Sequence, residues 1–68
     1  MKNSIKVERA KNNYTQAQLA KLAKVSRQTI NAIELGKYVP STVLSLKLAS
    51  IFKVEVSELF TLEEEDWS

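Results

Sequence analysis

The chain has 68 residues, enough for one domain with a modest hydrophobic core. It contains no cysteine and no histidine, which excludes disulfides, the usual zinc ligands and the commonest catalytic bases and thiol nucleophiles. So small a domain has little room for a substrate pocket, and we expect no catalytic residue, no metal and no cofactor. No apolar run reaches the length of a membrane span, and the N-terminus leads into no signal-peptide core. We therefore expect a cytoplasmic protein.

The net charge of +2 hides a strong asymmetry along the chain. Residues 1–53 carry ten basic and two acidic side chains, a balance of +8, whereas residues 54–68 carry six acidic side chains and no basic one. A basic body suits a polyanionic partner, which would repel the acidic end. An ordinary solvated surface with an acidic end explains the charge equally well. We expect a domain over residues 1–60 and an acidic tail over residues 61–68.

Capping signals predict that the chain forms short helices. The first is expected over residues 4–12, with Asn3 or Ser4 as its N-cap. The second follows a capping box over residues 15–18 and ends near Lys24. Its expected apolar stripe consists of Leu19, Leu22 and Ala23.

The third helix is expected over residues 27–35. Ser26 is its predicted N-cap, and Gly36 is placed to end it in the left-handed conformation. Ile30 and Ile33 fall on one side of this helix and form its expected buried face.

A fourth helix is expected over residues 42–53, with Ser41 as its N-cap. Apolar residues occupy two of its sides, which is typical of a central or interfacial helix. One side carries Leu44, Leu48, Ile51 and Phe52, and the other carries Leu46 and Ala49.

The last helix is expected over residues 56–60, with Leu59 and Phe60 packing back on the core. An extended segment follows, and a small β pairing between residues 1–3 and 61–64 would close the fold. The expected fold class is therefore all-α, with five short helices and this small terminal pairing.

The second and third helices, joined by a short turn, form a helix-turn-helix pattern. The outward side of the third helix carries Gln28, Asn31 and Ala32, flanked by Arg27 and Thr29. Glutamine and asparagine can pair with adenine, arginine with guanine, and alanine can contact a thymine methyl group. The flanking residues sit where side chains would meet phosphate. Ordinary surface polarity is the alternative interpretation of Gln28 and Asn31.

Four short motifs in this order and spacing resemble the Cro/C1-type helix-turn-helix family, the lambda-repressor-like domains. They are Thr15-Gln16-Ala17-Gln18-Leu19-Ala20, Val25-Ser26-Arg27-Gln28-Thr29-Ile30, Ile33-Glu34-x-Gly36 and Pro40-Ser41. The resemblance extends over about residues 5–60. It implies five helices, with the second and third as the DNA-binding unit. The implied function is that of a transcriptional regulator, expected to be a repressor that binds a palindromic operator as a homodimer.

The resemblance also implies which residues meet DNA. The residues at its base-reading positions are Arg27, Gln28 and Asn31. The residues at its backbone or flanking positions are Gln16, Ser26, Thr29, Lys37 and Tyr38. In this family the residue at the position of Gln16 typically binds a phosphate and braces the first base-reading side chain. The positive end of the second helix would assist that contact.

Glu34 lies about 40° from Ile30 on the helical wheel, at the edge of the buried face. A charge in such a place needs a partner, because an unpaired buried charge is costly. The resemblance implies that Arg9 is this partner, so we expect a structural ion pair. The alternative is that both side chains reach solvent and never meet.

The resemblance is to the short stand-alone members of the family, so we expect no second domain and no small-molecule effector. Members of this kind dimerise through their terminal segments, and the expected dimer interface is Phe60, Leu62 and Trp67. Alternatively, Phe60 completes its own core and residues 63–68 are frayed. A different class of function is an antitoxin-like or protein-interaction module of the same fold. In that case the acidic segment 63–67 would suit a basic protein partner.

Overall fold

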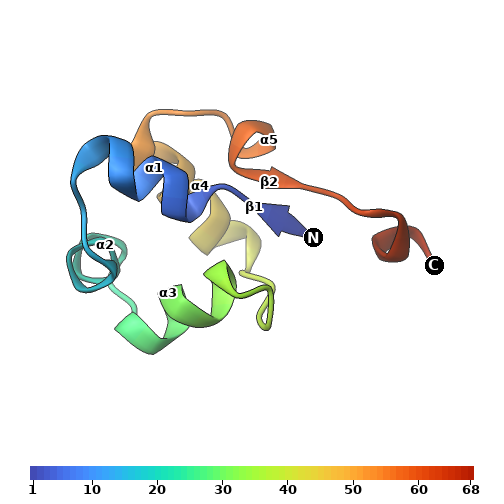
Figure 1. Cartoon of the computed structure of the whole chain (residues 1–68), viewed down its shortest axis with the longest axis horizontal. Helices are drawn as coiled ribbons and strands as arrows, with labels where there is room; N and C mark the ends of the chain where they lie inside the picture. Colours follow the sequence, from blue (N-terminus) through green and yellow to red (C-terminus); the bar gives the residue numbers. More distant parts are fainter.

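The computed structural model describes all 68 residues and contains five α-helices and one small antiparallel pairing of the two ends of the chain (Figure 1). The elements in chain order are β1 (Lys2–Asn3), α1 (Ile5–Asn12), α2 (Gln16–Ala23), α3 (Arg27–Glu34), α4 (Thr42–Phe52), α5 (Val56–Leu59) and β2 (Phe60–Thr61), followed by a 3-10 helix (Glu64–Trp67). The predicted fold class is confirmed. None of the helices combines the length and apolar character that a membrane crossing requires.

Three predicted caps begin the helices α2, α3 and α4. The hydroxyl of Thr15 accepts a hydrogen bond from the Gln18 amide at 3.0 Å, and the Gln18 side chain accepts one from the Thr15 amide at 2.8 Å. Ser26 and Ser41 accept in the same way from the third residue of their helices, each at 3.1 Å. These bonds satisfy donors that a helix start leaves free, so the three helices begin where expected.

Helix α1 begins differently, because Asn3 rather than Ser4 supplies the side-chain acceptor. The Asn3 Oδ1 accepts from the Ile5 amide at 3.2 Å, and its Nδ2 donates to the Ile33 carbonyl at 2.9 Å. The Ser4 hydroxyl instead donates to the Glu58 carbonyl at 3.1 Å. The start of α1 is thereby connected to both α3 and α5.

The ends of the helices use the left-handed conformation. Gly36 has φ of 74° and its amide donates to Ile33, while the amide of Lys37 donates to Ala32 at 2.9 Å, so Gly36 ends the third helix as predicted. Leu35 lies just outside α3 rather than within it. Three helices end without glycine, at residues with φ near 60°: Asn13, Lys24 and Lys53.

Helix α4 is central, and it packs against α1, α2 and α5. The core consists of twelve buried apolar residues: Ile5, Leu19, Ala20, Ala23, Ile30, Ile33, Leu44, Leu48, Ala49, Phe52, Leu59 and Phe60. Two expectations were wrong. Leu22 is 50% exposed, because α2 packs on both α3 and α4 and so buries its Leu19-Ala20 side. Ala49 is buried beside Leu48 rather than facing away from it.

The C-terminal segment differs in detail from its prediction. Helix α5 ends one residue early, at Leu59, and Phe60 enters β2, where it pairs with Asn3. The expected terminal pairing is therefore present but shorter. Beyond it the chain runs away from the helical body and closes into the 3-10 helix (Figure 1). This projection lies along the long axis of a molecule that measures 34 × 22 × 20 Å.

Candidate DNA-binding surface

Helices α2 and α3 pack against each other and are joined by a short turn at residues 24–26. Ile30 and Ile33 point into the core and are almost completely buried. Because these residues fix the rotation of α3 about its axis, its opposite side must face solvent. The helix-turn-helix arrangement predicted from the sequence is therefore present.

The exposed side of α3 brings together the three residues expected to read bases. Arg27, Gln28 and Asn31 are all exposed and line one shallow hollow without any apolar side chain. Thr29 is half-buried, and its hydroxyl lies 2.9 Å from that of Ser26. Hydrogen-bonding side chains of this kind match the edges of base pairs in a major groove.

The loop after α3 places Lys37 and Tyr38 close to the end of that helix. The Lys37 amide donates to the Ala32 carbonyl, which holds the loop backbone against α3. Both side chains are exposed, Tyr38 to 48%. These are the residues expected along the sugar-phosphate backbone.

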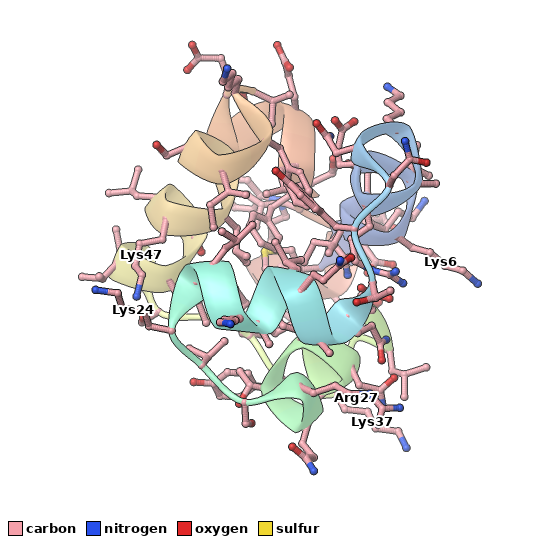
Figure 2. The ribbon with its side chains drawn as sticks, turned by 90° about the vertical axis from the view of Figure 1, so that its left-hand side faces the viewer. Lys6, Lys24, Arg27, Lys37 and Lys47 are labelled. Atoms are coloured by element: carbon pink, nitrogen blue, oxygen red, sulfur yellow. The ribbon has the colours of Figure 1, made fainter.

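The electrostatics of this surface are one-sided. In Figure 2, Arg27 and Lys37 extend outward at the same edge of the view, while Lys24 and Lys47 extend at the opposite edge. Between residues 16 and 38 the only acidic residue is Glu34. The surface around α3 therefore presents positive charge with almost no opposing negative charge.

Glu34 itself is neutralised by Arg9. The Arg9 Nε donates to Glu34 Oε2 at 2.7 Å and its Nη2 donates to Oε1 at 3.1 Å, while Nη1 donates to the Tyr14 carbonyl at 3.1 Å. The Glu34 side chain is only 7% exposed and that of Arg9 16%. Hydrogen bonding to Glu34 raises the pKa of the Arg9 guanidinium above its usual value. This two-point contact joins α1 to α3.

The resemblance implied that Gln16 braces the first base-reading side chain, but the structure brings it to Asn31, the last of the three, and to Glu34. The Gln16 Nε2 lies 3.2 Å from Glu34 Oε1 and 3.1 Å from Asn31 Oδ1. Asn31 and Glu34 are three residues apart and so lie on the same side of α3. This spacing is a signal that could have placed Gln16 between them once α2 and α3 were paired.

The chain ends form a second cluster of charges, also unpredicted. The Met1 amine lies 2.9 Å from a Glu63 carboxylate oxygen and 3.1 Å from one of Asp66. Hydrogen bonds to Glu63, and then to Asp66, raise the pKa of the amine. The Asp66 carboxylate accepts hydrogen bonds from the Glu63 amide and from the Met1 amine, and these, in that order, lower the pKa of Asp66. The acidic segment is thus held against the N-terminus of the chain, at Met1.

The residues expected at a dimer interface differ greatly in exposure. Leu62 is 57% exposed and Trp67 is 75% exposed, whereas Phe60 is only 8% exposed. Phe60 belongs to the core of its own chain, since β2 turns it toward the helices. It has little surface left to offer a second copy, which is a correction to the expected set.

Comparisons with known proteins agree with this architecture. A family model described as helix-turn-helix matches residues 5–59. An uncharacterized HTH-type transcriptional regulator of Methanocaldococcus jannaschii is 50% identical over 66 residues, which cover 97% of this chain and 100% of that protein. The uncharacterized HTH-type transcriptional regulator YgzD of Bacillus subtilis is 46% identical, with the same coverage. An HTH-type regulator of Archaeoglobus fulgidus is 44% identical, over 97% of this chain and 93% of its own.

The match of the family model over nearly the whole chain agrees with the motifs and with the observed packing of α2 and α3. The chain therefore belongs to the Cro/C1-type helix-turn-helix family of DNA-binding transcriptional regulators, whose members are not enzymes.

Proposed function

We propose that this protein is a cytoplasmic repressor that binds a palindromic operator as a homodimer. Residues 1–60 bind DNA, and residues 61–68 contribute to the contact between two copies. Helix α3 enters the major groove of each half-site. Occupation of a promoter by such a dimer would block it.

The observation that carries this proposal is the polar, exposed side of α3. Arg27, Gln28 and Asn31 lie together there, and the only acidic side chain nearby is paired with Arg9. Arginine suits guanine, and glutamine and asparagine suit adenine or another base edge that accepts hydrogen bonds. The contacts to phosphate and sugar are assigned to Gln16, Ser26, Thr29, Lys37 and Tyr38.

A dimer follows from the small size of one such surface. A few base contacts cannot select one site among the many that a genome offers, and two copies one DNA turn apart, about 34 Å, double them. Leu62 and Trp67 are the exposed apolar residues of the projecting C-terminal segment. The neighbouring carboxylates would be repelled by phosphate, which orients this end away from DNA.

A second candidate function is an antitoxin-like module whose main partner is a protein. The observation in its favour is the segment Glu63–Trp67, which combines four acidic side chains with an exposed tryptophan. Such a segment would suit a basic partner protein. A small toxin-like reading frame beside the gene would support this function, whereas an isolated gene would speak against it.

A footprint on the DNA upstream of the protein's own gene, measured over a series of salt concentrations, tests the proposal. We expect two protected half-sites with centres about 10 base pairs apart. Binding should weaken steeply with salt, since each phosphate contact releases condensed counterions. Uniform coating of the DNA without a protected site, or no binding at all, would favour the protein-interaction module.

A further inference from the structure

A row of four side chains connects a buried ion pair to the exposed side of α3. Arg9 holds Glu34, Glu34 accepts a hydrogen bond from Gln16, and the same Gln16 nitrogen donates to Asn31. Glu34 is 7% exposed, whereas Asn31 is exposed. The row therefore passes from the interior to the surface assigned to DNA.

The charge of Glu34 fixes the direction of every hydrogen bond in this row. An ionised carboxylate can only accept hydrogen bonds, so Gln16 must turn its amide nitrogen, not its oxygen, toward Glu34. The second hydrogen of that nitrogen points to Asn31. Asn31 must therefore accept it with its side-chain oxygen, Oδ1. The Nδ2 of Asn31 has no partner within the chain and is left with both of its hydrogens free.

From this geometry we infer that Glu34 is a positioning residue for base recognition, although it never touches DNA. Acting through Gln16, it makes Asn31 a donor toward the groove. Guanine, which presents two acceptors, N7 and O6, is the best match. The two-point pair with adenine is the weaker match, since Oδ1, which accepts from Gln16 with one lone pair, would have to accept from N6 with the other. This inference rests on the proposed function, because it assumes that Asn31 faces a base pair.

Selection from a DNA library with randomised half-sites tests the inference. The base pair that Asn31 faces is identified as the position whose preference disappears in Asn31→Ala. At that position we expect the wild-type protein to prefer guanine over adenine. Gln16→Met keeps the Arg9–Glu34 pair but frees Asn31 to rotate, so the preference for guanine should fall by on the order of tenfold. Preferences at the other positions should stay unchanged.

Two further variants separate positioning from folding. Glu34→Gln removes the charge that sets the direction of the Gln16 hydrogen bonds. It should weaken the preference for guanine at the base pair that Asn31 faces, in a variant that circular dichroism shows to be folded. Gln18→Ala breaks the capping box of α2, so it should lower affinity for all sequences alike without changing any preference. Loss of stability lowers binding to all sequences, so it cannot change the base preference at one position only.

The outcomes distinguish this inference from the proposed function. A wild-type protein that selects no sequence would overturn the proposed function, and this inference with it. A wild-type protein that selects an operator but prefers adenine opposite Asn31 would overturn the inference alone. So would a Gln16→Met protein that keeps the full wild-type preference for guanine.

Discussion

Two clusters of charge connect the N-terminal part of this chain to a distant segment, and they differ in burial. Arg9 and Glu34 are both less than one-fifth exposed and share two hydrogen bonds. In the terminal cluster the two carboxylates are more open to solvent, with 30% of the Glu63 side chain and 26% of the Asp66 side chain exposed. A buried charge that loses its partner is severely destabilising, whereas an exposed pair contributes little and is screened by salt. We therefore expect the buried pair to contribute more to stability than the terminal cluster, and the terminal cluster to be the more sensitive to salt and pH.

The largest expected effect comes from breaking the buried cluster. Arg9→Ala should lower the free energy of unfolding by about 3–5 kcal/mol, because it leaves the Glu34 carboxylate buried without its cation. Replacing both residues, with Arg9→Met and Glu34→Leu, should cost much less. Urea denaturation measures both. Equal losses from the single and the double replacement would contradict a mutual interaction.

A smaller effect is expected on the surface that this cluster supports. Gln28→Ala should weaken specific binding by about 1–3 kcal/mol and leave non-specific binding nearly unchanged. Asn31→Ala should cause a loss of specific binding of the same size, through the base pair that Asn31 faces. Titrations against an operator and against unrelated DNA make the comparison.

Lys37→Ala is the matching change for Gln28→Ala, at a residue of the same surface that is assigned to the sugar-phosphate backbone of DNA. It should weaken binding to all sequences alike and reduce the salt slope by about one unit. If Gln28→Ala and Lys37→Ala lowered specific and non-specific binding equally, the side of α3 assigned to the groove would be incorrect.

Removing the terminal segment should affect stability much less than Arg9→Ala does. Truncation after Phe60 keeps every core residue, and the ionic contacts that it removes are open to solvent, so the free energy of unfolding should fall only slightly. We expect the truncated chain to sediment as a monomer and to bind a full operator far more weakly. Leu62→Glu in the whole chain should have the same effect on assembly. Val7→Glu changes an equally exposed apolar residue of α1 and should leave the dimer intact.

A truncated chain that still sedimented as a dimer at micromolar concentration would place the interface elsewhere. The candidate would then be α4 around Leu46, which is 56% exposed. In that case the terminal segment would have no part in assembly.

Features that depend on neighbouring residues were predictable from the sequence. Ser26 and Ser41 begin their helices, and Gly36 ends α3, because capping is decided within a few residues. The helix ends at Lys24 and Lys53 were placed only approximately. Both adopt the left-handed conformation without the glycine that usually marks it.

Features that depend on distant residues were not predictable in the same way. Leu22 was expected in the core, but the burial of a helix face depends on which helices pack against it. The bond from Gln16 to Asn31 spans 15 residues, and that from the Met1 amine to Asp66 spans 65. Residue types and spacing identified the exposed side of α3, whereas the connections behind it required the packed structure.

The smallest expected effect is a pH dependence of the terminal cluster. Its contacts raise the pKa of the Met1 amine above its ordinary value, about 8, so their contribution is complete below that pH and is lost as pH rises through the raised pKa. The lowered pKa of Asp66 acts in the opposite direction. That contribution is complete above about pH 4 and is lost as pH falls through the lowered pKa. The segment should therefore be docked between these limits and released at either extreme.

Trp67, the only tryptophan, follows Asp66 in the chain, and we expect its fluorescence to change when the segment is released. We expect a plateau across the neutral range with one transition at each end. Glu63→Gln should move the alkaline transition to lower pH, because Glu63 contributes most to the raised pKa of the amine, and Asp66→Asn should move it less. Glu64→Gln is the matched control, since Glu64 pairs with no basic group and its loss leaves the contacts of the amine in place. An alkaline midpoint that is the same in Glu63→Gln and in the wild-type protein would mean that the amine does not hold the segment in solution. The projecting end of the chain would then be attached through β2 alone.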